Sequence, residues 1–575
     1  MLWHIGNTTV RTPYRLQEAL KALLGSPLNG NLAGRDQEQA FAEFLYESQI
    51  VEVGRVDQGV DASDVGRKWR VALSQLGFIT PQLTRNIANG AADPIVAAHA
   101  AGIETLSGRQ YEITPNGARL GLADTIAAQQ ECFLRSLVTY RIPSPLEDRY
   151  ACTPFSPLRF VLDVLHAMQA AGGAPVLSFE EFALHVQTAS PDNGVGHVAG
   201  EVLAYRAARE AARGNVRAFD RARYEAIAER VDRLARTLDD YADLSFRYLK
   251  ATGLFRNAGR GIGLSANKAQ LAELIRQTPR QFADDRAYFQ ALWLGAVLPT
   301  DDLGTAWVVV NDLADQLTAR GVPSAPPPVG TALPDIELVR HAFEERLLQL
   351  DEEEFAAAQA GLVDEIAAWM DAIAARGTAT LPDGTRLTVP RGEAPAYLEW
   401  AIWRAFLAIN SLVKPPWEAR NFKIDQDFLP VHCAPGGRPD MVFEFDNAIV
   451  VVEVTLTASS RQEAAEGEPV RRHVAQYAEN SAKQVYGLFI AIQIDSNTAH
   501  TFSAGAWYLP DDTKISLDIV PLTLADFKRF LLGGRANLAD MPQRLRQLLM
   551  ECRSVSNRDA PQWKRAIGEI VQRMS

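Results

Sequence analysis

Residues 438–457 restrict the fold of this chain most strongly, because they are predicted to form a β-hairpin that opposes two carboxylates. Apolar residues alternate before Asp446-Asn447, which suits a two-residue turn, and a β-branched run suited to a buried strand follows. In a hairpin closed by a two-residue loop, the register of the facing residues is fixed. Asp440 then lies directly across from Glu453, with the Cβ atoms roughly 5 Å apart.

Two like charges in this position destabilise a sheet unless something neutralises them. Glu453 lies among apolar and β-branched neighbours, and a lone ionised carboxylate in a buried strand is costly unless it is paired or bound to a metal. A divalent cation held by oxygen ligands is the obvious candidate. The alternative for Glu453 is an edge strand on which the side chain faces water.

The composition is that of an ordinary globular protein, with 47% hydrophobic and 22% charged residues, and the length of 575 residues predicts about three or four domains. No apolar run is long enough to span a membrane, the start of the chain lacks a secretory signal, and the four cysteines show no metal-ligand spacing. We therefore expect a cytoplasmic protein with reduced thiols. The net charge of −12 does not favour nucleic-acid binding, but residues 201–290 hold 17 Lys+Arg against 12 Asp+Glu, and local patches decide such binding.

Two similar patterns in the N-terminal half predict DNA-binding modules. In the first, an amphipathic helix ends at Gly77, and residues 111–120 read as a short strand, a Pro-Asn-Gly turn and the start of another strand or helix. In the second, a helix ends at Gly253 and a Gly-rich hairpin runs to Ser265. This order resembles winged-helix modules, in which a helix enters the major groove and a hairpin contacts the backbone. The candidate DNA-contacting residues are Arg67, Lys68, Arg70, Arg247, Lys250, Arg256 and Arg260.

Each of these features has an alternative explanation. Winged helices also serve as protein-interaction modules, and the cations named above could be solvated helix faces. A long Arg-rich helix, predicted from about Val202 to Leu238, is better explained as a salt-bridged exposed helix. The clearest linker is the Pro-rich segment 321–330, which separates this helix-rich half from the half that holds the hairpin.

The segment that follows the hairpin supplies further acids and bases. Its helix is predicted to begin near Pro469, a favoured first-turn residue, and it could bring Glu466 back over the hairpin. The alternative is a solvated loop, because Glu463 and Glu468 have the same chemistry. His473 is a possible proton carrier, although a lone histidine is more often structural, and Arg471 and Arg472 fit phosphate contacts.

Glu399 is the single acid in a strongly apolar predicted helix, residues 395–409. It is either an exposed residue or a further ligand aimed at the carboxylate pair. Helical periodicity alone favours the exposed position.

Two short motifs and several longer segments of the chain resemble known nuclease families. Pro439-Asp440 followed by Glu453-Val454-Thr455 is similar to the PD-(D/E)xK nuclease core. The longer block 453–474, the strand that starts at Lys483 and the opening residues 3–11 resemble the AlwI family of type II restriction endonucleases. The resemblance covers most of the chain and is strongest from Pro395 to Thr501.

The resemblance implies which residues carry the chemistry. The catalytic acids of the family fall on Glu399, Asp440, Glu453 and Glu466. Thr455 stands where many nucleases of the wider superfamily have lysine, a substitution that AlwI-type members share. The role of activating water therefore stays open between Glu466 and His473.

The expected site binds Mg²⁺, for which Mn²⁺ can substitute, since the ligands are hard oxygens without Cys or a His pair. Asp440, Glu453 and the main-chain carbonyl of Val454 hold the metal. Glu399 and Glu466 hold a second metal or order waters.

The sequence patterns predict a multi-domain α/β (α+β) protein, and the resemblance implies that it cleaves double-stranded DNA at a fixed distance outside a short asymmetric site. The predicted domains are 1–140 and 141–320, both winged-helix-like recognition domains, 321–390, a Pro-rich linker and helical connector, and 391–575, the PD-(D/E)xK-type endonuclease domain. The free protein is expected to be a monomer. Double-strand cleavage would need a transient dimer or a second subunit, and a companion DNA methyltransferase belongs to such a system. The rival functions are a nicking or modification-dependent endonuclease, and a DNA-binding regulator with a vestigial nuclease domain.

Overall fold

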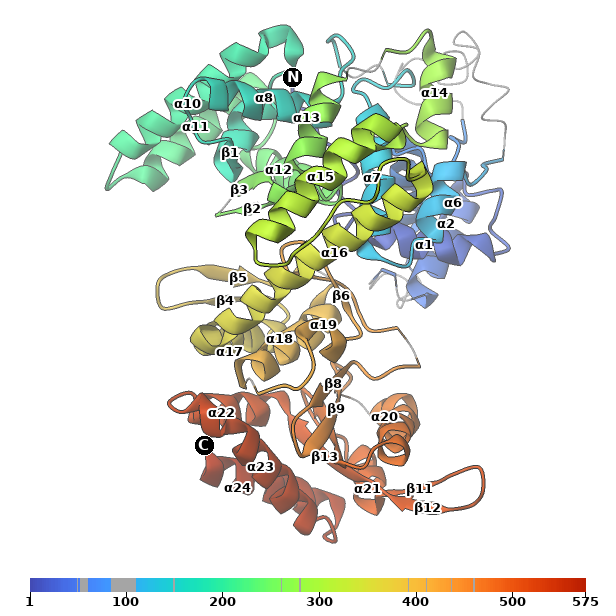
Figure 1. The fold of residues 1–575 in the computed structure, drawn as a ribbon, viewed down its shortest axis with the longest axis vertical. Coiled ribbons are helices and arrows are strands. Elements are labelled where there is room, and N and C mark those ends of the chain that lie inside the picture. Colours follow the sequence, from blue (N-terminus) through green and yellow to red (C-terminus); the bar gives the residue numbers. More distant parts are fainter. Residues whose placement is uncertain are drawn as a thin grey trace. The chain divides into compact units, whose positions relative to one another are not determined.

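The computed structural model describes residues 1–48, 50–51, 60–83, 110–147, 150–259, 261–278, 281–390, 392–409, 411–435, 437–458 and 461–575. The chain forms two compact units, Met1–Leu347 and Leu348–Ser575 (Figure 1). The boundary falls within one long helix, whereas the Pro-rich segment 321–330 lies before that helix. Among the described residues, no helix has the length and apolarity needed to cross a membrane.

The first unit is mainly helical. Its helices are α1 (Arg15–Leu24), α2 (Arg35–Glu47), α3 (Ser63–Gln75), α6 (Pro115–Gly121), α7 (Ile126–Thr139), α8 (Pro157–Ala170), α9 (Phe179–Glu181), α10 (Val195–Ala211), α11 (Val216–Arg230), α12 (Ala235–Lys250), α13 (Ala269–Gln277), α14 (Asp285–Leu294), α15 (Leu303–Ala319) and most of α16 (Leu333–Ala358). Short turns of other helical types are η1 (Phe182–Val186), η2 (Pro191–Asn193), η3 (Ala266–Lys268) and η4 (Pro299–Asp301). Its strands are β1 (Val176–Ser178), β2 (Phe255–Ala258) and β3 (Gly261–Leu264).

The second of the two N-terminal patterns forms a helix followed by a hairpin. Helix α12 buries a strongly amphipathic face and ends before Gly253, whose φ of +72° suits glycine. A Cβ there would also approach Gln130 Oε1 to 2.7 Å, so the position restricts both conformation and size. Strands β2 and β3 follow as an antiparallel pair, and β1 completes a sheet of order β1-β3-β2.

The first pattern forms a smaller version of this arrangement. Helix α3 buries Trp69 and Leu73, and an isolated antiparallel bridge joins Ile79 to Ile113. The Pro-Asn-Gly sequence is the first turn of α6, where Thr114 caps the helix by accepting a hydrogen bond from Gly117 N.

The prediction of one long helix from Val202 to Leu238 is wrong. Three helices, α10, α11 and α12, cover this region, because the chain turns between them at Gly214, with φ +94°, and at Asp232, with φ +53°. The exposed, ion-paired character expected for the region holds for α11, in which Ala228 is the buried residue.

The second unit is a layered α/β structure. Its helices after α16 are α17 (Val363–Ala374), α18 (Ala394–Ile409), α19 (Pro416–Ala419), α20 (Arg461–Asn480), α21 (Ser496–Ala504), α22 (Leu524–Gly534), α23 (Met541–Ser554) and α24 (Ala560–Met574), with short turns η5 (Gln359–Leu362) and η6 (Leu538–Asp540). Its strands are β4 (Thr378–Thr380), β5 (Arg386–Thr388), β6 (Lys423–Ile424), β7 (Pro430–His432), β8 (Met441–Glu444), β9 (Ala448–Thr455), β10 (Gln484–Ala491), β11 (Ala506–Tyr508), β12 (Lys514–Ser516) and β13 (Asp518–Thr523). The mixture of helices and several small sheets confirms the predicted mixed α/β class.

A four-stranded mixed sheet of order β13-β10-β9-β8 is the centre of this unit. The β8–β9 hairpin is antiparallel, and β9, β10 and β13 run parallel. Phe443 on β8 stacks on Phe406 of α18 at 4.0 Å between ring centroids, whereas Gly487 on β10 faces Val474 of α20. Because cross-strand partners share a face, the register places these two residues on opposite faces, so α18 and α20 sandwich the sheet (Figure 1).

Helix α20 begins at Arg461, so the prediction of a start near Pro469 is wrong. The residues before the proline are good helix formers, and a proline inside a helix removes one hydrogen bond without always ending it. Gln462 also anchors the first turn, because its side-chain amide donates to the carbonyls of Thr457 and Gln493.

Candidate active site

The β8–β9 hairpin has the predicted register. Met441 pairs with Val452 and Glu444 with Ile449, and Phe445 N donates to Ala448 O across the two-residue turn at 2.8 Å. The next pair in this register is Asp440 and Glu453. Asp440 lies just before β8, and its Oδ2 accepts a hydrogen bond of 2.8 Å from Val454 N. The two carboxylates therefore lie at the same end of the hairpin.

Glu453 points to the face of the sheet that α20 covers. The residue is 8% exposed, and its Oε1 lies 2.5 Å from His473 Nδ1 on α20. The two groups are within hydrogen-bonding distance, and the histidine is itself buried. Glu466 lies two helical turns earlier on α20, and its carboxylate accepts a hydrogen bond from the side chain of Thr455.

Glu399 also belongs to this cluster, and the expectation of an exposed position is wrong. The side chain is 5% exposed, and its Oε2 accepts a hydrogen bond of 2.8 Å from Ala434 N. The Cys433 thiol donates to the same carboxyl group. Helical periodicity fails for α18 because the helix is buried along its whole length, between the sheet and α17.

Burial raises the pKa of each of the four acids, and repulsion from a neighbouring acid raises the pKa of Glu399, Asp440 and Glu453 further. Burial is the main cause for the carboxyl group of Asp440, and Glu453 adds to it, while the Val454 hydrogen bond opposes the rise. For Glu399, burial raises the pKa and Asp440 raises it further. Burial and the charge of Glu466 raise the pKa of Glu453 to about 8. The pKa of Glu466 is raised by burial as well.

The pKa of His473 is lowered, which favours the neutral imidazole. Burial lowers its pKa, and the nearby positive charge of Arg472 lowers it further. The two shifts together favour the neutral imidazole beside a protonated Glu453 carboxyl group.

Three glutamates of α20, Glu463, Glu466 and Glu468, lie in different environments. Glu466 is electrostatically coupled to Asp440 and Glu453. Glu463 turns to α21, where Thr501 Oγ1 donates to it at 2.7 Å. Glu468 is exposed and pairs with Arg472 at 3.1 Å.

The residues present fit a hard divalent cation. In the described part of the chain, no three His, Cys, Asp or Glu side chains converge closely enough to complete a metal site by themselves. The candidate donors are the carboxylates of Asp440 and Glu453, and Mg²⁺ commonly takes one or two carboxylates and keeps several waters. Glu399 and Glu453 are buried, and Asp440 and Glu466 are partly buried, so the cluster leaves a demand for positive charge that no neighbouring Lys or Arg in the described residues meets directly.

Most of the candidate DNA-contacting cations pair with acids or amides of their own module. Arg67 and Lys68 contact Asp64, and Arg70 contacts Glu38 at 2.9 Å. Arg247 pairs with Asp243 at 3.0 Å, and Lys250 donates to Asn257 at 3.2 Å. Arg260 lies outside the described residues.

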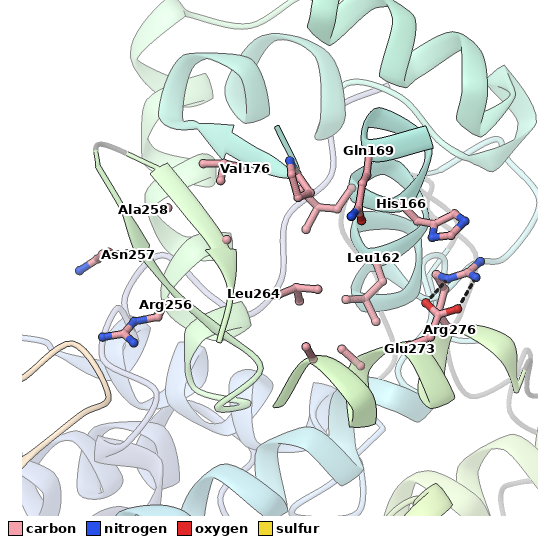
Figure 2. A pocket seen from close by; sticks show the side chains of 15 residues that line it. Leu162, His166, Gln169, Val176, Arg256, Asn257, Ala258, Leu264, Glu273 and Arg276 are labelled. Atoms are coloured by element: carbon pink, nitrogen blue, oxygen red, sulfur yellow. Dashed lines mark hydrogen bonds and ion pairs between the residues drawn. The ribbon is translucent and has the colours of Figure 1, made fainter. Parts of the chain in front are cut away.

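Arg256 lines a groove of about 320 Å³ in the first unit. Figure 2 shows this groove between α8, the β2–β3 hairpin and α13, with Leu162 and Leu264 facing it and the ion pair Glu273–Arg276 at one side. The groove is mainly apolar.

The hydrogen-bond partners of Glu399 and Glu466 could not be predicted from the sequence. Cys433 and Ala434 fix Glu399, and Thr455, noted as a replacement for lysine, fixes Glu466. The motif marked Thr455 as unusual, but no local signal indicated that Cys433 lies beside a glutamate 34 residues earlier.

The sequence comparison identifies the chain as a type II restriction endonuclease, an enzyme that cleaves DNA at specific sequences. The chain belongs to the AlwI restriction endonuclease family, which matches residues 74–530, and the resemblance seen in the sequence is thus confirmed. Enzymes of this class generally use divalent metal ions. Among solved structures, the chain is similar to the small subunit of the heterodimeric restriction endonuclease R.BspD6I, with 24% identity over 32% of this chain and 91% of that chain and a TM-score of 0.27. No curated protein matches the chain.

Proposed function

We propose that this restriction endonuclease is Mg²⁺-dependent and hydrolyses DNA at a fixed distance outside a short asymmetric site. The observation that supports the proposal best is the opposition of Asp440 and Glu453 at the end of the hairpin, with Glu399 and Glu466 coupled to them. A cluster of four acids, of which Glu399 and Glu453 are buried, is costly to keep in a protein that only binds DNA, since a neutral residue at any of these positions would relieve the strain.

The division of labour follows the two units. Residues 391–575 form the PD-(D/E)xK-type catalytic domain in this proposal, and the first unit recognises DNA. Support for a winged-helix-like module comes from the order of α12 and the β2–β3 hairpin and from the sheet order β1-β3-β2. Contacts with phosphates would require Arg67, Lys68, Arg247 or Lys250 to exchange an intramolecular partner for DNA.

The proposed chemistry assigns each acid a task. Asp440, Glu453 and the Val454 carbonyl hold the cation, which polarises the scissile phosphate and acidifies a water molecule when it is bound. Glu466, fixed by Thr455, is placed to accept the proton of the attacking water, and Glu399 orders water on the side of Asp440. His473 holds the Glu453 carboxyl group and offers a second route for the proton.

The test uses isosteric variants that remove one charge each. Asp440→Asn and Glu453→Gln are expected to lower the Mg²⁺-dependent cleavage of supercoiled plasmid by more than about 100-fold, beyond the loss caused by removing an outer partner of a metal ligand. DNA binding, measured by gel shift in EDTA, should persist. The matched control is Asp446→Asn, because Asp446 is an exposed carboxylate at the other end of the same hairpin.

The products separate the rival functions. Sequenced ends at a constant offset from one motif support the proposal, and open-circular product alone indicates a nicking enzyme. Cleavage restricted to methylated DNA indicates a modification-dependent endonuclease, and cleavage of unmodified DNA that methylation blocks is expected where a companion methyltransferase protects the host. Full cleavage by Asp440→Asn would exclude this carboxylate from the mechanism.

A further inference from the structure

We propose that Asn421 is a positioning residue for Asp440 and that the ion pair Glu352–Arg420 fixes Asn421 in turn. This inference rests on the proposed function, since it concerns the geometry of the proposed metal ligand. None of the three residues belongs to the motif, and they lie 19 to 88 residues before Asp440 in the chain.

The backbone at Asp440 needs support from outside the sheet. Strand β8 begins at Met441, so no ladder hydrogen bond of that strand fixes Asp440. Pro439 has no N–H group to donate. On the other side of the residue, Val454 N holds the carboxylate itself.

Asn421 supplies this support with two hydrogen bonds. Its main-chain N–H donates to Asp440 O at 3.0 Å, and its side-chain Nδ2 donates to Pro439 O at 2.7 Å. One residue therefore holds two consecutive carbonyl groups, which fixes the rotation of the peptide between them. Together with the bond from Val454 N, these contacts fix the direction in which the Asp440 carboxylate points.

Arg420, the residue before Asn421, is held by contacts with three other residues. Arg420 bridges to Met441 in antiparallel fashion, and its guanidinium group donates to Phe422 O at 3.0 Å. Glu352 on α16 accepts two hydrogen bonds of 2.9 Å each from this guanidinium group, and its own side chain is 6% exposed. A bidentate pair of this kind restrains orientation more strongly than a single contact. The sequence of contacts runs from Glu352 through Arg420 and Asn421 to Asp440.

The main test is the Mn²⁺ dependence of Asn421→Ala in the full-length protein. Loss of the side-chain donor should raise the Mn²⁺ concentration for half-maximal plasmid cleavage by about tenfold, the usual effect of losing an outer partner of a metal ligand, and the maximal rate at saturating Mn²⁺ should be retained. The rise in melting temperature on titration with Mn²⁺, recorded without DNA, should shift to higher Mn²⁺ by the same factor. A merely structural role would lower the maximal rate and leave both half-saturation values unchanged.

Two further variants complete the experiment. Asn480→Ala is the matched control, because Asn480 Nδ2 also donates to a main-chain carbonyl, that of Gln476, on the exposed end of α20. Arg420→Lys keeps the positive charge but loses the bidentate hydrogen bonds to Glu352, and it should also raise the Mn²⁺ concentration for half-maximal cleavage. Its control is Arg535→Lys, in an exposed pair with Asp364, which should leave this concentration unchanged.

The outcomes distinguish this inference from the proposed function. Wild-type protein that cleaves and binds Mn²⁺, with unchanged half-saturation in Asn421→Ala and Arg420→Lys, overturns the positioning role alone. If Asn421→Ala fails to fold, Arg420→Lys decides between the same two results. Wild-type protein that neither cleaves nor gains stability with Mn²⁺ overturns the proposed function, and this inference with it.

Discussion

In the proposed metal site, protons and a cation would compete for the carboxylate of Glu453. Its pKa of about 8 lies above the value of 4.5 for an exposed glutamate, because burial and Glu466 disfavour the charged form. A carboxyl group with a raised pKa binds its proton more tightly in the folded than in the unfolded state. Its contribution to stability is therefore greatest at low pH, and it declines as the pH rises from 4.5 to about 8.

Mn²⁺ binding should consequently strengthen as the pH rises toward about 8, the pKa of Glu453. Below about pH 8, the apparent affinity for Mn²⁺ should increase about tenfold per pH unit for each proton that the cation displaces. Calorimetric titration of the DNA-free protein between about pH 6 and pH 9 measures both the affinity and the protons released. Asp446→Asn should reproduce the wild-type profile, because it leaves the buried acids intact. An affinity that is independent of pH over this interval would show that the acids bind the cation without losing protons.

At the scale of secondary-structure elements, the sequence predicts what local geometry determines. The two-residue turn fixes the hairpin register, so the opposition of Asp440 and Glu453 followed from the chain alone. The burial of Glu399 did not, because it depends on helices and strands that cover α18 from distant parts of the sequence. The start of α20 was misplaced because a proline favours a first turn but is also tolerated further along a helix that other contacts anchor.

Close packing between α20 and the sheet holds two site residues in place, and Gly487 permits it. A Cβ at this position on β10 would lie 2.7 Å from Val474 Cγ2 of α20 and 2.9 Å from Ile519 Cγ1. Gly487→Ala should displace α20, which carries Glu466 and His473, and lower the free energy of unfolding by about 1–3 kcal/mol.

The displacement should also slow cleavage at temperatures where the variant is fully folded. Urea denaturation and plasmid cleavage, measured side by side, check both effects. Gly568→Ala is the matched control, because Gly568 lies in helix α24 with nothing within 4 Å of a new Cβ, and it should be neutral or slightly stabilising. Wild-type stability and wild-type rate in Gly487→Ala would mean that the sheet and α20 accommodate a methyl group without moving.

At the scale of the whole molecule, the number of catalytic centres limits what one chain can do to a duplex. The described residues contain one cluster in which Glu399, Asp440, Glu453 and Glu466 are coupled. The two strands of a duplex run in opposite directions, so one centre in one orientation attacks one strand in each binding event. Cleavage of the second strand then requires a second chain. The rate of this step therefore depends more steeply on the enzyme concentration than the rate of the first step.

Supercoiled plasmid should therefore pass through an open-circular intermediate. With less enzyme than recognition sites, open circles should accumulate, and the conversion of open circles to linear DNA should accelerate more than proportionally when the enzyme concentration is raised. A time course over a series of enzyme concentrations measures both steps on one gel. Addition of Glu453→Gln protein, which binds DNA but lacks a ligand, should slow the second step more than the first, because mixed pairs of chains then contain one inactive centre. Linear product that forms directly, without open circles and in proportion to enzyme, would mean that a single chain cuts both strands before it dissociates.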